Sequence, residues 1–133
     1  MKKQKTVVTF GTFDLFHIGH VNILTRAAAL GDRLVVGISS DELNESKKGR
    51  RPIYTFEARA HILNALDCVD SVFVEHSLEK KRDYLIEHEA DVLVMGDDWA
   101  GKFDEFCDIC EVVYLPRTKD ISTTELIHMI KDY

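Results

Sequence analysis

Residues 6–20 read TVVTFGTFDLFHIGH, and the fold can be worked out from them in both directions. The opening run, Thr6–Phe10, is β-branched and apolar and ends at Gly11, which is typical of a buried strand. From Ile18 to Leu30 the apolar residues recur at helical spacing, and Gly31 supplies a stop signal. The segment therefore predicts a strand joined to a helix by a short turn.

Four more apolar runs predict strands, and charged or helical segments separate them. The expected strands are Arg33–Ser39, Ser71–Val74, Asp91–Gly96 and Glu111–Leu115, and the expected helices run from Thr55 to about Leu66, over Leu78–His88, and onward from a cap at Ser122. The polar, basic segment Asp41–Arg51 is interpreted as a loop. Near-continuous apolar strands alternating with helices indicate a parallel sheet that is covered on both faces. The prediction is an α/β fold, a Rossmann-like doubly wound five-stranded parallel sheet with helices on both faces, in a single domain over residues 1–133.

Composition and charge limit the classes of partner. Of the 133 residues, 45% are apolar and 30% charged, and the formal net charge is -6. An acidic chain argues against a broad nucleic-acid or anionic-membrane surface, because both need a basic patch. No run approaches the ~20 apolar residues of a membrane span, and Met1–Lys5 leads directly into a strand without the apolar region of a signal peptide. We expect a cytoplasmic protein with no nucleic-acid partner and no membrane insertion.

The three cysteines are Cys68, Cys107 and Cys110. The spacing of the last two fits either a redox pair or half of a metal site. A zinc site would need a second pair of ligands, and only Cys68 remains. A thioredoxin-like motif would follow the first strand, whereas this pair lies late in the chain. We interpret all three as ordinary reduced thiols.

His17 and His20 stand three residues apart where the first helix is expected to begin, so their side chains share one face. The N-terminus of a helix offers free backbone N–H groups and positive potential, which suit a phosphate. Gly11 and Gly19 allow a ligand to approach the backbone closely. The turn falls at the carboxyl end of a strand, where doubly wound sheets bind ligands. Zinc binding is the weaker interpretation, because no third ligand stands nearby at a suitable spacing.

Motifs at both ends of the chain resemble one enzyme superfamily. GTFDL (residues 11–15) with HIGH (17–20) resembles the GTFD…HxGH signature of the HxGH nucleotidyltransferases. RTKDISTT (117–124) resembles the RTxGISTT signature of their cytidylyltransferase branch. MGDDW (95–99), GKFD (101–104) and CEVVYLP (110–116) resemble the small bacterial cytidylyltransferases that act on glycerol 3-phosphate. The resemblance covers essentially the whole chain.

The resemblance implies transfer of a cytidylyl group from CTP to a small phosphorylated alcohol, with glycerol 3-phosphate the first choice, toward teichoic-acid or capsule polymers. Such a transfer depends mainly on positioning and on stabilising charge at the phosphoryl oxygens. The implied catalytic residues are His17, His20, Lys47 and Arg117. The implied nucleotide-binding residues are Thr12, Phe13, Asp14, Gly19, Lys48, Arg59, Asp98, Ser122, Thr123 and Thr124. Mg²⁺ and a homodimer are also implied.

Several of these residue types suggest particular roles. Arg117 would pair with phosphate oxygens as a fork-shaped donor. Asp98 would accept a hydrogen bond from the amino group of cytosine. Asp14 would order the turn or bind the cation. Lys47 or Lys48 would reach over the triphosphate, and the sequence leaves open which of them does so.

Three positions and one segment depart from the glycerol-3-phosphate pattern. Asp120 replaces a glycine, Asp67 replaces a basic residue, and Leu78 replaces a tryptophan. Residues 48–53 resemble the sugar-phosphate nucleotidyltransferases instead. The acceptor therefore stays open among glycerol 3-phosphate, phosphoethanolamine, another polyol phosphate and a heptose phosphate, and ATP is an alternative to CTP. A nucleotide sensor without turnover and a thiol-redox protein are the alternative classes.

Overall fold

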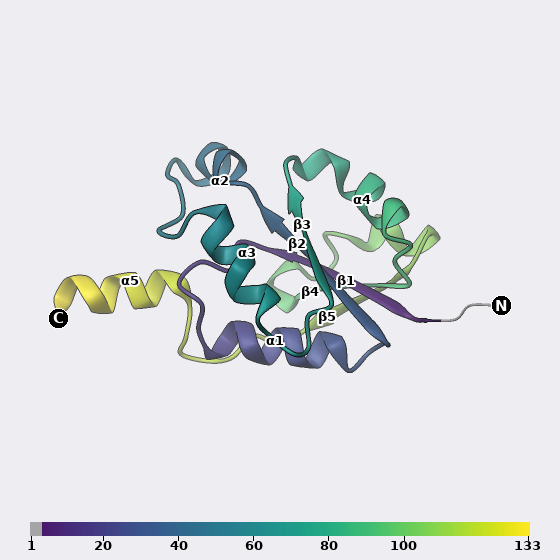
Figure 1. Cartoon of the computed structure of the whole chain (residues 1–133), viewed down its shortest axis with the longest axis horizontal. Coiled ribbons are helices and arrows are strands. Elements are labelled where there is room, and N and C mark those ends of the chain that lie inside the picture. The colour runs from purple at the N-terminus through teal and green to yellow at the C-terminus, as the bar shows by residue number, and fades with distance from the viewer. Residues whose placement is uncertain (1–3) are drawn as a thin grey trace.

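The computed structural model describes residues 4–133 and contains a five-stranded parallel sheet (Figure 1). Its strands are β1 (Thr6–Gly11), β2 (Arg33–Ser39), β3 (Ser71–Glu75), β4 (Val92–Gly96) and β5 (Glu111–Leu115). Their order is β3-β2-β1-β4-β5. The chain moves outward from β1 as far as β3 and then returns to the other side of β1. The predicted doubly wound sheet is confirmed, and the basic start at residues 1–3 lies outside the described part.

The described part of the chain also contains five α-helices and three short 3₁₀ segments, and all of them except the C-terminal helix connect strands. They are α1 (Ile18–Ala28), α2 (Asp41–Lys48), α3 (Phe56–Asn64), η1 (Leu78–Lys80), α4 (Lys81–Glu87), η2 (Asp97–Trp99), η3 (Asp104–Asp108) and α5 (Thr123–Asp132). Within residues 4–133, no helix is both long and apolar enough to cross a membrane. Because the strand order reverses beside β1, the turns after β1 and β4 diverge and leave a crevice at the carboxyl ends of the strands.

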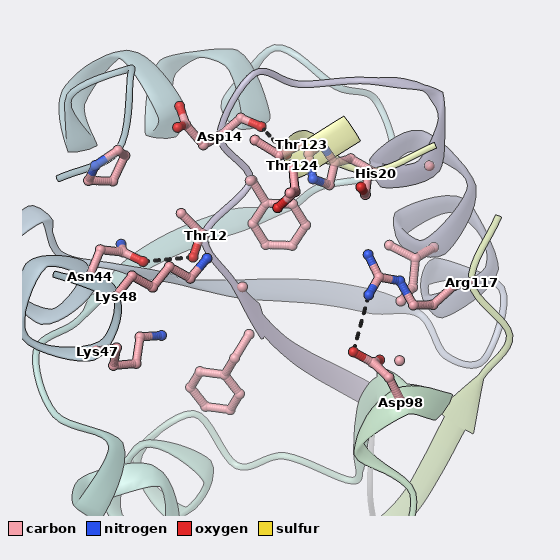
Figure 2. Close-up of a pocket in the computed structure, with 18 of the residues that line it drawn as sticks. Thr12, Asp14, His20, Asn44, Lys47, Lys48, Asp98, Arg117, Thr123 and Thr124 are labelled. Carbon is pink, nitrogen blue, oxygen red and sulfur yellow. Dashed lines mark hydrogen bonds and ion pairs between the residues drawn. The ribbon is translucent and has the colours of Figure 1, made fainter. Parts of the chain in front are cut away.

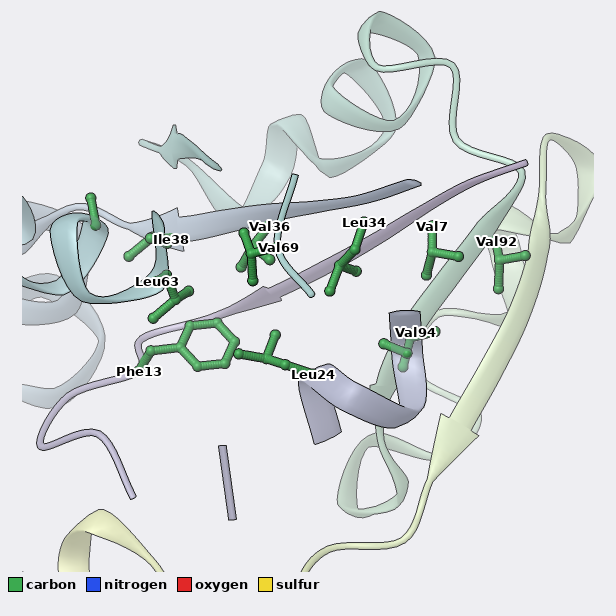
Figure 3. Close-up of a cluster of buried hydrophobic side chains, with 12 residues drawn as sticks. Val7, Phe13, Leu24, Leu34, Val36, Ile38, Leu63, Val69, Val92 and Val94 are labelled. Carbon is green, nitrogen blue, oxygen red and sulfur yellow. The ribbon is translucent and has the colours of Figure 1, made fainter. Parts of the chain in front are cut away.

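Two apolar layers hold the helices against the two faces of the sheet. One layer joins β1, β2 and β4 to α1 and α3 through Val7, Leu34, Val36, Val92, Val94, Leu24, Ala27, Ala60 and Leu63 (Figure 3). The other joins the same strands to α4 and η3 through Val8, Phe10, Val35, Leu93, Met95, Leu85 and Phe106. Successive strand residues point to opposite faces, so strands buried on both sides read as continuous apolar runs. Helices on both faces are therefore confirmed.

The prediction of a loop over Asp41–Arg51 is wrong, because most of it forms helix α2. Ser40 caps this helix by accepting a hydrogen bond from the backbone N–H of Leu43. Acidic residues fill its first turn, Lys47 and Lys48 fill its last turn, and both ends therefore complement the helix dipole. Gly49 ends the helix in the left-handed conformation, with φ of 76°. The helix buries only Leu43 and Asn44, so its apolar periodicity is too weak to mark it.

Helix α5 begins where the sequence predicts, since Ser122 accepts a hydrogen bond from the N–H of Glu125. The helix extends away from the sheet (Figure 1). None of its residues is buried, and Met129 and Ile130 are about two-thirds exposed. The structure therefore leaves Met129 and Ile130 uncovered, whereas Leu126 and Ile127 are half-buried.

The core on the α1–α3 side sets a stability expectation. Leu63 is fully buried on α3, so we expect Leu63→Ala to lower the free energy of unfolding by about 2–5 kcal/mol through lost burial and a cavity. Ile86→Ala is a matched control on the exposed face of α4 and should change it by less than about 0.5 kcal/mol. Urea denaturation measures both, and equal effects would contradict the assignment of this core.

Candidate active site

A cleft with a volume of about 530 Å³ opens at the carboxyl ends of the strands (Figure 2). Its walls come from the β1–α1 turn, from α2 and the loop after it, from the start of α4, from the turn after β4, and from residues 117–127. Sites for small molecules occupy roughly 300–1,000 Å³. The cleft therefore has the size and the place in the topology that a ligand site requires.

Backbone strain and a buried carboxylate shape the β1–α1 turn. Phe13 and Leu15 adopt positive φ angles of 54° and 47°, which side-chain-bearing residues rarely adopt. Asp14 lies between them and is buried. Its carboxylate accepts hydrogen bonds from the backbone N–H groups of Ile53 at 2.6 Å, Tyr54 at 2.9 Å and Leu15 at 3.1 Å. The surrounding contacts thus hold a strained turn, and strain of this kind gathers at functional sites.

The two histidines are fixed by hydrogen bonds to backbone N–H groups. His17 caps α1, and its Nδ1 accepts from the N–H of Gly19 at 3.0 Å. His20 reaches back, and its Nδ1 accepts from the N–H of His17 at 3.2 Å. A neutral imidazole that accepts at Nδ1 carries its proton on Nε2. Both rings therefore keep an Nε2–H donor, and they stack with centroids 3.8 Å apart.

Gly19 makes this arrangement possible. A Cβ at that position would lie 2.8 Å from Cε1 of His17 and 2.9 Å from its Nδ1. A larger residue would therefore push the ring out of the cap.

Burial and nearby positive charge keep both rings neutral at pH 7. The pKa of His20 is lowered to about 3, first by burial and then by the neighbouring His17 and Arg117. The pKa of His17 is also lowered, first by burial and then by Arg117. Acceptance at Nδ1 adds to this, because a protonated ring has no acceptor. The pair can donate hydrogen bonds without carrying a charge.

Cationic side chains stand on two sides of the cleft, and Figure 2 shows Lys47 and Lys48 facing Asp98 and Arg117 across it. Arg117 donates from Nη1 to Oδ2 of Asp98 at 3.2 Å, and both side chains are about half-exposed. Much of Lys47 is open to solvent, yet partial burial lowers its pKa, while Glu75 raises it. Both lysines line the cleft, so the structure does not choose between them.

The motifs from the two ends of the chain meet here. Ser122 caps α5, and the hydroxyl of Thr123 donates to the backbone carbonyl of Asp14 at 2.8 Å (Figure 2). That hydrogen bond joins residues 109 positions apart. The predicted site residues that line the cleft are Thr12, Phe13, Asp14, His17, Gly19, His20, Lys47, Lys48, Asp98, Arg117, Ser122, Thr123 and Thr124.

Arg59 is the exception among the predicted site residues. Its side chain is fully buried, and it is absent from the cleft wall. The guanidinium donates to the backbone carbonyls of Thr12, Ser39 and Tyr54 and to the carboxylate of Asp41 at 2.6 Å. The expected direct contact with a nucleotide is therefore not available to it in this structure. Arg59 instead holds β1, β2, α2 and the 52–55 loop in place.

The acidic residues of the cleft fit a metal ion poorly. Both carboxylate oxygens of Asp14 accept backbone N–H groups, and Asp98 is paired with Arg117. Among residues 4–133, no group of three histidine, cysteine, aspartate or glutamate side chains could hold a metal. Mg²⁺ commonly keeps its waters and binds through substrate phosphates and one or two carboxylates. Asp14 therefore orders the turn, and any Mg²⁺ here would depend on phosphates for its ligands.

Sequence reasoning missed several polar residues of the cleft wall, among them Glu75, Lys81 and Asn44. Glu75 and Lys81 line the cleft as a buried ion pair. Asn44 is buried on α2 and accepts a hydrogen bond from Thr12 at 2.9 Å. Glu75 ends β3, and the rule that ligands gather at the carboxyl ends of strands would have identified it. Lys81 and Asn44 carry no comparable signal, because charged residues on helices are usually solvated.

The structure shows where the three residues that depart from the glycerol-3-phosphate pattern lie relative to the cleft. Asp120 adopts a φ of 62°, so it meets the left-handed geometry for which glycine is the usual choice. Leu78 lines the cleft and is 44% exposed. Asp67 is exposed and lies outside the cleft, whereas Arg50 and Arg51 line it.

This fold and this cleft define a nucleotidyltransferase. The sequence model of the cytidylyltransferase-like family matches residues 8–129. The chain therefore belongs to that family, and the resemblance drawn from its motifs is confirmed.

Two relatives of this chain carry the same enzyme name, and a solved structure shares its fold. The chain is 52% identical over 123 residues to the glycerol-3-phosphate cytidylyltransferase of Bacillus subtilis (strain 168), and the match covers 92% of this chain and 95% of that protein. It is 44% identical over 123 residues to the enzyme of the same name from Staphylococcus aureus (strain NCTC 8325 / PS 47), covering 92% of each. The lipopolysaccharide core biosynthesis protein from Thermoplasma volcanium GSS1 superposes with a TM-score of 0.75 at 23% identity, over 88% of this chain and 100% of that one. That likeness shows the fold alone.

The lowered pKa of His20 makes stability depend on pH. As the pH falls below 6.5, the ordinary pKa of histidine, His20 becomes protonated in the unfolded chain. In the folded protein His20 stays neutral until about pH 3. The free energy of unfolding should therefore fall as the pH drops from 6.5 toward 3. We expect His20→Asn, which keeps an acceptor, to flatten this dependence in urea titrations between about pH 6.5 and 4.5. His128→Asn, on the exposed face of α5, should leave the slope unchanged; equal slopes in all three proteins would contradict the shift.

Proposed function

We propose that this protein transfers a cytidylyl group from CTP to glycerol 3-phosphate, forming CDP-glycerol and releasing pyrophosphate. The observation that carries the proposal is the meeting of the HxGH turn and the start of α5 on one cleft, joined by Thr123 and Asp14. The choice of acceptor is supported by two relatives at 52% and 44% identity, both named glycerol-3-phosphate cytidylyltransferase. The product would supply an activated glycerol phosphate unit for teichoic-acid or capsule polymers.

In the proposed reaction, a phosphate oxygen of the acceptor attacks the α-phosphorus of CTP. A new oxygen–phosphorus bond forms, and the bond to the oxygen that bridges the α- and β-phosphates breaks. Negative charge moves onto the phosphoryl oxygens and the departing pyrophosphate. The protein therefore needs to align two anions and stabilise the shifting charge.

The Nε2–H groups of His17 and His20 suit that task. Each ring is fixed by the hydrogen bond that its Nδ1 accepts from a backbone N–H, so the rings need little reorganisation when negative charge develops on the phosphates. Hydrogen bonds from neutral donors strengthen most where negative charge develops on the acceptor, so they favour the transition state. Additional cations would bind the substrate and the transition state to a similar extent. The N-termini of α1 and α5 add further N–H groups for the phosphates.

The remaining groups divide between the phosphates and the base. We assign Arg117 and the cleft-facing lysines, Lys47 and Lys48, to the phosphate oxygens, and Asp98 to the cytosine amino group. Arg117 and Asp98 must exchange their mutual ion pair for these partners, a small cost because exposed ion pairs are worth only about 0–1 kcal/mol. Mg²⁺ would enter on the triphosphate and offset its charge.

We further propose a homodimer, on the family resemblance together with the exposed apolar side chains of Met129 and Ile130 on α5. A cytoplasmic location is proposed because the reaction consumes a nucleoside triphosphate.

A panel of donors and acceptors tests the proposal. The protein is incubated with CTP or ATP, Mg²⁺, and in turn glycerol 3-phosphate, phosphoethanolamine, ribitol 5-phosphate or a heptose phosphate. Pyrophosphate release gives the rates, and mass spectrometry identifies the product. We expect CTP with glycerol 3-phosphate to give the highest kcat/KM. Faster turnover with ATP, or with another acceptor, would contradict the proposed substrates, and no turnover with any pair would favour a nucleotide sensor.

His17→Ala tests the proposed histidine role. We expect kcat to fall by at least ~10²-fold, because the hydrogen bond is strongest in the transition state. CTP affinity, measured calorimetrically without acceptor, should change much less. His61→Ala, exposed on α3, is the control and should keep full turnover. An unchanged kcat in His17→Ala would remove this residue from the chemistry.

A further inference from the structure

The segment between β5 and α5, residues 116–122, brings Arg117 to the cleft, yet apolar packing does little to hold it. Each of its residues is exposed or only partly buried, and no residue of α5 after it is buried. Asp120, within the segment, adopts a left-handed φ of 62°. Hydrogen bonds to the rest of the protein must therefore fix where this segment lies.

Helix α1 supplies such hydrogen bonds. Asn22 and Arg26 lie four residues apart, so they share one face of the helix. Nδ2 of Asn22 donates to Oγ1 of Thr118 at 2.8 Å. Nη1 of Arg26 donates to the backbone carbonyl of Pro116 at 3.4 Å, from an exposed position. The bond from Asn22 is shorter and partly buried, so it is the stronger tie between α1 and this segment.

The same bond decides where the hydroxyl of Thr118 can donate. A threonine hydroxyl has one hydrogen and two acceptor lone pairs. Because Oγ1 of Thr118 accepts the N–H of Asn22, the hydroxyl hydrogen points elsewhere. Thr118 lines the cleft, whereas Asn22 stands behind it and does not. The hydroxyl hydrogen is thus left for an acceptor atom on the cleft side.

Thr118 stands close to the groups proposed to bind phosphate. It follows Arg117 directly in the chain. Further along the segment, Cγ2 of Ile121 lies 3.3 Å from the place that a Cβ on Gly19 would occupy. The segment therefore runs along the start of α1, where His17 is held. A donor at Thr118 is placed to meet the ligand that these groups bind.

We infer that Asn22 is a positioning residue for the nucleotide, because it holds the Thr118 hydroxyl so that this group donates to an oxygen of bound CTP. The inference rests on the proposed function, since it takes CTP as the ligand. Asn22 acts through Thr118 and does not touch the nucleotide. A donor that is already oriented loses little freedom on binding. It holds substrate and transition state alike, so its loss should raise KM for CTP and change kcat little.

Asn22→Asp tests the inference, because it keeps the shape of the side chain and replaces the N–H donor with an acceptor. The carboxylate would draw the hydroxyl hydrogen of Thr118 away from the cleft. We expect KM for CTP, and Kd for CTP measured calorimetrically, to rise about 10-fold, with kcat within about twofold of the parent value. Asn64→Asp makes the same change at the exposed end of α3, outside the cleft, and should match the parent protein.

Thr118→Val separates the lost orientation from the negative charge that Asn22→Asp introduces. Removing the hydroxyl should itself raise Kd for CTP about 10-fold. In that background Asn22→Asp should weaken binding by less than about threefold, since the hydroxyl that it misdirects is gone. Equal penalties in both backgrounds would mean simple charge repulsion and would overturn the inference. So would an Asn22→Asp variant that binds CTP as the parent does, or one that loses kcat with KM unchanged.

Asn22→Ala guards against an aspartate variant that fails to fold. It removes the donor, adds no charge and favours the helix. Circular dichroism confirms folding, and its effect on Kd for CTP should also disappear in the Thr118→Val background. An effect that persists there would overturn the inference. If the parent protein neither binds CTP nor turns it over, the proposed function itself fails, and that result is obtained before any variant is measured.

Discussion

The site depends on how Asp14 is held. Its carboxylate gathers the N–H groups of Leu15, Ile53 and Tyr54, while its carbonyl accepts from Thr123. These contacts connect the β1–α1 turn, the loop after α2 and the start of α5, which are far apart in sequence. Charge-assisted hydrogen bonds of this kind are among the strongest available to a backbone. They can therefore sustain two positive φ angles, each costing about 1–3 kcal/mol, and the turn then presents His17 and His20 in one orientation.

The charge of the cleft differs from that of the chain. The protein carries a formal charge of -6, yet six cationic and three acidic side chains line the cleft. Low-dielectric walls concentrate such a local field, so anions are attracted to the cleft and repelled elsewhere. The same field explains why the histidines stay neutral: Arg117 and burial both oppose a further positive charge. Two kinds of hydrogen-bond donor therefore coexist in the cleft, cationic side chains and neutral imidazoles.

The strands, the parallel sheet with helices on both faces and the two end motifs could be predicted, because each leaves a local mark. Apolar runs such as Leu34–Ile38 identify buried strands, and paired histidines after a strand predict a phosphate site. What failed depends on tertiary contacts. Arg59 looks like a surface ligand in sequence, but three carbonyls and Asp41 satisfy its guanidinium inside the protein. Glu75 and Lys81 lie six residues apart with nothing local to join them, and only the end of β3 meeting the start of α4 makes them a pair.

The finding that Asp41–Lys48 form helix α2 and not the predicted loop matters for function as well as for fold. A loop carrying Lys47 and Lys48 would lose about 1–2 kcal/mol of conformational freedom per residue when it closed on a ligand. In α2 that ordering has already occurred on folding, and the lysines occupy the last turn, where the helix dipole favours positive charge. Arg59 strengthens this by bonding Asp41 in the first turn, and Asn44 joins the helix to Thr12. The cations are thus part of a rigid frame with the β1–α1 turn, and only the ends of their side chains need to move when an anion arrives.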